Sequence, residues 1–142
     1  MNWEYTRDNR TDAQVHQNYA MGKKAQKLII ERLKEYTDVR YTDDDVYGQV
    51  STYTPDCEIV YRGEWVPLEI KYTKTKLSQV HWKENQWRHA RSHGGYLLQI
   101  SAGRCALIAP SDKHYMKDSG YCNKQVAVFS PEWYPTFACI LI

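Results

Sequence analysis

Residues 54–71, with the sequence TPDCEIVYRGEWVPLEIK, decide the fold, because they predict two short strands joined by a tight turn around Gly63. The first strand begins at a Pro-Asp pair that contains Asp56, and the second ends with Glu-Ile-Lys at 69–71. Side chains alternate across a strand, so the Glu and the Lys of this triplet point to one face and the Ile to the other. A hairpin closed at Gly63 can bring Asp56 near them. Two carboxylates beside one ammonium group are typical of a divalent-metal site.

The bulk composition is that of one ordinary globular domain. The chain has 142 residues, of which 42% are hydrophobic and 25% charged, enough for one mixed core but not for two. No apolar run approaches the roughly 20 residues that span a bilayer, and the N-terminus lacks a signal-peptide layout, so we expect a cytoplasmic protein. The cysteines are far apart without a CxxC pair, and we expect reduced, mostly buried thiols at Cys57, Cys105, Cys122 and Cys139.

Periodicity and turn residues predict helices alternating with strands. We expect helices over 19–36 and 77–93, the second capped by Ser78 and stopped by Gly94-Gly95, and strands over 46–54, 96–100, 105–108 and 126–129. Ser130-Pro131 predicts a further helix start, residues 110–124 form a loop or an irregular helix, and the apolar tail 137–142 returns to the core or packs in a dimer interface. This order suits an α/β sheet with helices on its faces.

Positive charge is concentrated directly after the hairpin. Residues 71–93 contain six Lys and Arg against one Glu, a net charge of +5, so the rest of the chain carries −3 of the total of +2. A solvated helix face is the ordinary explanation for such a run. Its position beside the candidate metal site favours contact with phosphate groups instead, through Lys74, Lys76, Lys83, Arg88 and Arg91.

The pattern Pro55-Asp56…Glu69-Ile70-Lys71 resembles the motif of the PD-(D/E)XK nuclease superfamily. The resemblance implies a restriction-endonuclease-like core, a mixed central sheet flanked by helices. It also implies that Mg²⁺, with Mn²⁺ as a substitute, binds Asp56, Glu69 and the carbonyl of Ile70, while Lys71 activates or orients the attacking water. It extends over about residues 19–108 of a single nuclease domain, leaving a polar arm at 1–18 and a C-terminal extension at 109–142. The alternative is that these motif residues form an exposed surface ion pair.

Position 26 departs from the family pattern. Relatives usually place a metal-binding Glu on the first helix, a few residues after a Gly, and here that position holds Gln26. Gln26 can ligate through its carbonyl oxygen but brings no charge, which implies weaker metal affinity; a hydrogen-bonded helix residue is an equal alternative. Glu31 is a less suitable substitute because it lies on the polar side of the helix.

The segment after Lys71 also has family character. Relatives carry a Gln on the following helix that supports the site or the DNA backbone, which makes Gln86 the candidate, with Gln79 as the alternative. We expect Trp82 and Trp87 to pack against the sheet. The chain is most similar to small phage Holliday-junction endonucleases and virus-type replication-repair nuclease domains.

The expected function is therefore that of a Mg²⁺-dependent endodeoxyribonuclease that selects branched, flap or junction DNA by shape, in DNA repair or recombination. The resemblance implies a phage or mobile-element setting, the host cytoplasm, DNA as the partner and a homodimer, since such relatives often act as dimers. Two alternatives are a non-catalytic nucleic-acid-binding module on the same fold and an interaction protein that uses its Tyr and Trp residues.

Overall fold

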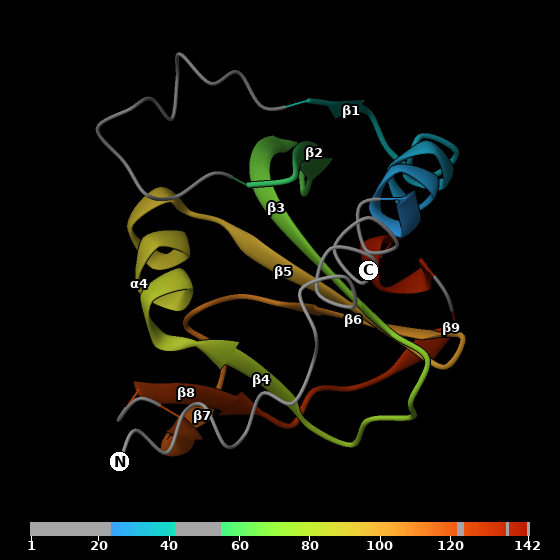
Figure 1. Cartoon of the computed structure of the whole chain (residues 1–142). Coiled ribbons are helices and arrows are strands. Elements are labelled where there is room, and N and C mark those ends of the chain that lie inside the picture. Colours follow the sequence, from blue (N-terminus) through green and yellow to red (C-terminus); the bar gives the residue numbers. More distant parts are fainter. Residues whose placement is uncertain (1–23, 42–54, 122–123, 136, 142) are drawn as a thin grey trace.

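The computed structural model in Figure 1 describes residues 24–41, 55–121, 124–135 and 137–141. Its strands are β1 (Val39–Arg40), β2 (Cys57–Tyr61), β3 (Glu64–Thr73), β4 (Val80–Lys83), β5 (Tyr96–Ser101), β6 (Arg104–Ile108), β7 (His114–Tyr121), β8 (Lys124–Phe129) and β9 (Tyr134–Pro135). Its helices are residues 24–33, α4 (Glu84–His93) and the 3-10 helix η1 (Ala138–Leu141). The strands form a six-stranded sheet, ordered β1-β2-β3-β5-β6-β9, and a three-stranded sheet, ordered β4-β8-β7. The expected α/β class with a mixed central sheet is confirmed.

The hairpin predicted from residues 54–71 is present as β2 and β3. Its register runs from Cys57 opposite Leu68 to Tyr61 opposite Glu64. The two-residue turn has positive φ at both positions, 52° at Arg62 and 82° at Gly63, the conformation whose twist matches that of the flanking strands. β3 then pairs in parallel with β5, which makes it a central strand of the large sheet.

Each face of the large sheet is covered by different elements. On one face, Ile70 and Leu98 belong to a core cluster that helix 24–33 completes with Ile29, Ile30 and Leu33. On the other face, Leu97 packs in a second cluster with residues of β4, α4 and β8, namely Val80, Trp82, Trp87, Ala90, Ala127 and Phe129. Glu69 and Lys71 alternate with Ile70, so they project toward the second cluster. Figure 1 shows helix 24–33 and α4 well apart on the two sides of the sheet.

The helix predicted over 77–93 is wrong in its first part. Residues 80–83 form strand β4, with Val80 opposite Phe129 and Lys83 opposite Val126 of β8. Burial alternates along β4, the period of a strand, and Ser78 caps no helix because α4 begins at Glu84. The predicted end is confirmed, since Gly94 takes the left-handed conformation, with φ of 68°.

The C-terminal region is built into the same packing. The loop or irregular helix predicted over 110–124 is wrong for residues 114–121, which form strand β7 because they pair with β8. Strand β8 includes the predicted strand 126–129. The helix start at Ser130-Pro131 is wrong, because the chain continues without helix into β9, which pairs with β6 and forms the edge of the large sheet. The apolar tail returns to the core through its buried residues Phe137, Cys139 and Ile140.

The first helix and the cysteines differ little from the predicted features. The first helix ends at residue 33 rather than 36. Free, buried thiols are confirmed at Cys57, Cys105 and Cys139. The arm at 1–18, the helix before residue 24, the strand at 46–54 and Cys122 lie outside the described residues. None of the described helices has the length and hydrophobicity of a transmembrane segment.

Candidate active site

Asp56 is held at the start of β2 by two hydrogen bonds to β3. Its backbone N–H donates to the carbonyl of Leu68 at 2.9 Å, and its Oδ2 accepts from the backbone N–H of Ile70 at 2.7 Å. Ile70 lies between Glu69 and Lys71 in the chain. The hairpin register therefore fixes the Asp56 carboxylate beside the triplet that the sequence singled out.

Glu69 is a half-buried carboxylate with several charged neighbours. Burial is the main cause that raises its pKa above the usual value, and the nearby Asp56 raises it further. Lys71, the indole N–H of Trp82 and Lys83 lower the pKa in part. The two carboxylates are thus close enough to repel each other, and a bound cation would relieve that repulsion.

Trp82 orients Glu69 directly. Its Nε1 donates to Oε2 of Glu69 at 2.8 Å, and the Trp82 side chain is fully buried in the second core cluster. The sequence indicated only packing for Trp82, because residue 82 was assigned to a helix. The alternation of Val80 and Trp82 with His81 and Lys83 is the signal that reveals a strand here.

Lys71 reaches toward β4 rather than into solvent. Its Nζ donates to the backbone carbonyl of His81 at 3.1 Å. Burial lowers the pKa of Lys71, as does Lys83, while Glu69 opposes them. Within the described chain Glu69 and Lys71 form no direct ion pair. A direct ion pair between Glu69 and Lys71, as the alternative would require, is therefore not formed.

Asp56 and Glu69 are the carboxylates of this group that could hold a metal ion. Among the described residues, no group of three or more His, Cys, Asp or Glu side chains could do so. Mg²⁺ commonly binds one or two carboxylates and keeps water or substrate phosphate as its other ligands. The carbonyl of Ile70, between Glu69 and Lys71, would be the third protein oxygen.

The candidate fourth position makes no hydrogen bond to these described site residues. Gln26 lies on helix 24–33, which packs on the sheet face opposite to Glu69 and Lys71, and it makes no hydrogen bond to a described residue. Glu31 is exposed and pairs with Lys34 at 2.9 Å. The role of Gln26 as a ligand stays a prediction.

Gln99 is a polar residue of this site that the sequence did not indicate. It lies on β5 opposite Lys71, is 5% exposed, and its Nε2 donates to the carbonyl of Ile100 at 3.1 Å. It lines a shallow hollow of about 470 Å³ together with Lys71, Gln79 and His81. The apolar run around Gln99 indicates only a buried strand and gives no signal of a polar site residue.

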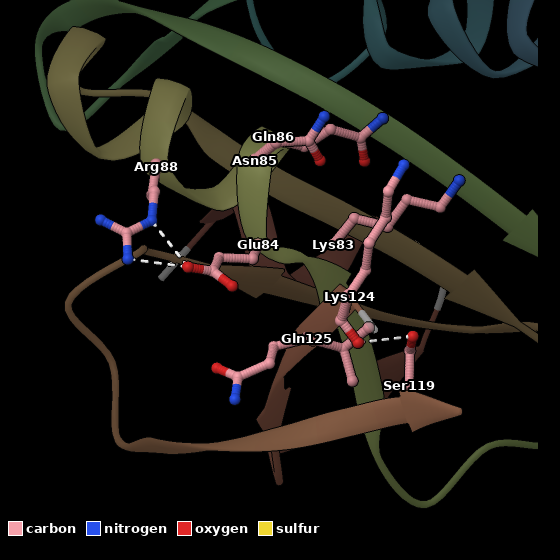
Figure 2. Close-up of a pocket in the computed structure, with 9 residues that line it drawn as sticks. Lys83, Glu84, Asn85, Gln86, Arg88, Ser119, Lys124 and Gln125 are labelled. Atoms are coloured by element: carbon pink, nitrogen blue, oxygen red, sulfur yellow. Dashed lines mark hydrogen bonds and ion pairs between the residues drawn. The ribbon is translucent and has the colours of Figure 1, made fainter. Parts of the chain in front are cut away.

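The predicted DNA-binding residues divide into three groups. Lys74 and Lys76 are exposed in the connection after β3. Arg91 stacks over Trp87, with its guanidinium 5.6 Å from the ring centre. The third group lines a hollow of about 700 Å³ at the start of α4, which contains Lys83, Gln86 and Arg88 (Figure 2). Arg88 is held by Glu84 at 2.7 and 2.9 Å, and Oε1 of Gln86 is buried without a hydrogen-bond partner.

No protein-family model matches the chain, and no curated protein matches its sequence.

Proposed function

We propose that the chain is a metal-dependent endodeoxyribonuclease with a restriction-endonuclease-like core. One observation carries the proposal: Asp56 and Glu69 are brought together on adjacent strands around the backbone of Ile70, with Lys71 on the same face as Glu69. Two half-buried carboxylates that repel each other cost free energy unless a cation or a proton offsets their charge. A metal-binding role gives a reason for that cost.

The chain's own residues would act on DNA as follows. Asp56, Glu69 and the Ile70 carbonyl would hold Mg²⁺, which when bound supplies positive charge for the transition state and lowers the pKa of water. The Lys71 ammonium, fixed by its hydrogen bond to His81, would stand near the attacking water and favour loss of its proton. Trp82 would keep the Glu69 carboxylate in a single orientation.

Substrate choice would depend on DNA shape. Lysine and arginine contacts to phosphate position a duplex without reading its sequence. Lys74 and Lys76 are exposed and available for this purpose, as is Lys83 in the hollow at α4. We therefore propose branched, flap or junction DNA as the substrate class, and a homodimer where two strands are cut.

A non-catalytic DNA-binding module is the second candidate, and the two-carboxylate set favours it. Gln26 stands where relatives of the resembled family carry a third carboxylate, and the described residues offer no replacement for it. A protein that lost this ligand would keep its cationic residues and bind DNA without cleaving it.

Incubation with linear, flap and four-way DNA in Mg²⁺ or Mn²⁺ separates the two candidates. The nuclease proposal predicts cleavage that Asp56→Ala and Lys71→Ala abolish, while Lys34→Ala, a surface ion-pair variant, retains it. Binding without cleavage in either metal would support the module instead. Gln26→Ala tests the fourth position, and loss of cleavage only in Glu31→Ala would overturn its assignment.

A further inference from the structure

We propose that the hollow at the start of α4 binds a nucleotide unit of the DNA strand next to the scissile phosphate, with Lys83 and Lys124 contacting its phosphate. This inference rests on the proposed function for its ligand. Lys124 belongs to the C-terminal region, for which the sequence suggested no role.

The two lysines reach the hollow from neighbouring strands. Lys83 ends β4 opposite Val126 of β8, and Lys124 lies two residues before Val126, so both lysines emerge on the same face of the small sheet. Figure 2 shows their ammonium groups extending in the same direction, toward the side where Asn85 and Gln86 lie. Within the described chain neither ammonium group takes part in an ion pair or hydrogen bond. Two unpaired cations at one hollow favour an anionic ligand.

The first turn of α4 adds to this preference. Lys83, at the N-cap, provides no side-chain acceptor, so the first backbone N–H groups of the helix lack a capping partner. The acidic residue of this turn, Glu84, is engaged by Arg88 at 2.7 and 2.9 Å, which offsets its charge. The N-terminal end of a helix favours negative charge, and phosphate oxygens would accept from its N–H groups.

The hollow adjoins the candidate active site through Lys83. Lys83 directly follows Trp82, whose indole N–H donates to Glu69 at 2.8 Å, and Lys71 donates to the carbonyl of His81 on the same strand. A strand bound in the hollow would therefore continue toward Asp56 and Glu69. The small sheet would serve as a strand-holding surface beside the catalytic groups.

The test is Lys124→Gln, which removes one charge at an exposed position distant in the sequence from every proposed catalytic residue. Binding of a labelled oligothymidylate strand is followed by fluorescence anisotropy in EDTA over a series of salt concentrations. The logarithm of the association constant falls linearly with the logarithm of the salt concentration. Loss of one phosphate contact makes this slope less negative by about 0.7, which corresponds to roughly fivefold weaker binding near 0.1 M salt. Lys27→Gln is the matched control, because Lys27 is equally a solvent-exposed lysine but lies on helix 24–33 across the large sheet.

The expected result is a reduced slope and weaker binding for Lys124→Gln, with Lys27→Gln close to the unsubstituted protein. Equal effects of the two substitutions would overturn the proposed subsite. This binding test and the nuclease proposal can fail independently. If Lys124→Gln weakens strand binding more than Lys27→Gln does, but the protein does not cleave DNA in Mg²⁺, only the nuclease activity is rejected. Circular dichroism of both variants checks that the fold is kept.

Discussion

Replacing Trp82 with Phe removes the indole N–H that donates to Glu69 while keeping an aromatic ring in the core. The hydrogen bond is 2.8 Å long, the indole is fully buried, and the acceptor is a half-buried carboxylate whose pKa the indole lowers. A hydrogen bond to a charged group contributes about 1.5–3 kcal/mol. Partners that orient a metal ligand typically change metal affinity by about 10–100-fold. We therefore expect Mg²⁺ affinity to fall by at least about tenfold, and the pKa of Glu69 to rise further.

Isothermal titration calorimetry with Mg²⁺ measures the effect, and Trp87→Phe provides a matched control. Trp87 is also buried, at 7% exposed, and its Nε1 donates to the carbonyl of Pro110 at 2.9 Å, with no hydrogen bond to Glu69. Both substitutions remove one indole N–H and reduce the size of a buried aromatic ring, so Trp87→Phe controls for the loss of packing. Equal Mg²⁺ affinities in the two variants would refute the orienting role of Trp82.

Two further predictions concern pH and the core. The folded-state pKa of Glu69 is raised, so metal-free protein should lose stability as pH rises from about 4.5 through that pKa. Because Mg²⁺ competes with the proton, the rise in Tm on adding Mg²⁺ should grow over the same window and disappear in Glu69→Gln; a pH-independent rise would contradict this assignment. Phe137→Ala should lower the free energy of unfolding by about 3–5 kcal/mol, since the ring is 1% exposed and packs 5.4 Å from the Tyr36 ring. Urea denaturation measures this loss, and a change below about 1 kcal/mol would show that the tail is not part of the core.

The hairpin could be predicted because its determinants are local. Gly63 supplies a positive φ, and alternating side chains on both sides of the turn set the register that brings Asp56 to Ile70. The end of α4 is also determined by a nearby residue, because Gly94 takes the left-handed conformation that ends the helix. Within this part of the chain, the motif and its geometry followed from neighbouring residues.

The remaining features depend on distant partners. β4 is a strand because it pairs with β8, which lies much later in the chain. Residues 77–83 are also compatible with a helix, so their local sequence did not predict the strand. The contact of Trp82 with Glu69 depends on that pairing, as does the position of Lys124 beside Lys83. Similarly, β9 forms because the edge of β6 offers unpaired backbone groups, which overrides the helix-start signal at Ser130.

The most direct measurement is the cleavage of a four-way DNA junction in Mg²⁺ by the unsubstituted protein and by Asp56→Asn, which keeps the side-chain shape but removes the charge. The proposed two-carboxylate site predicts cleavage that depends on added metal and that falls in Asp56→Asn to the level seen in EDTA. Cleavage that persists in Asp56→Asn would contradict the site, and its absence from the unsubstituted protein with Mg²⁺ or Mn²⁺ on every DNA form would contradict the nuclease function.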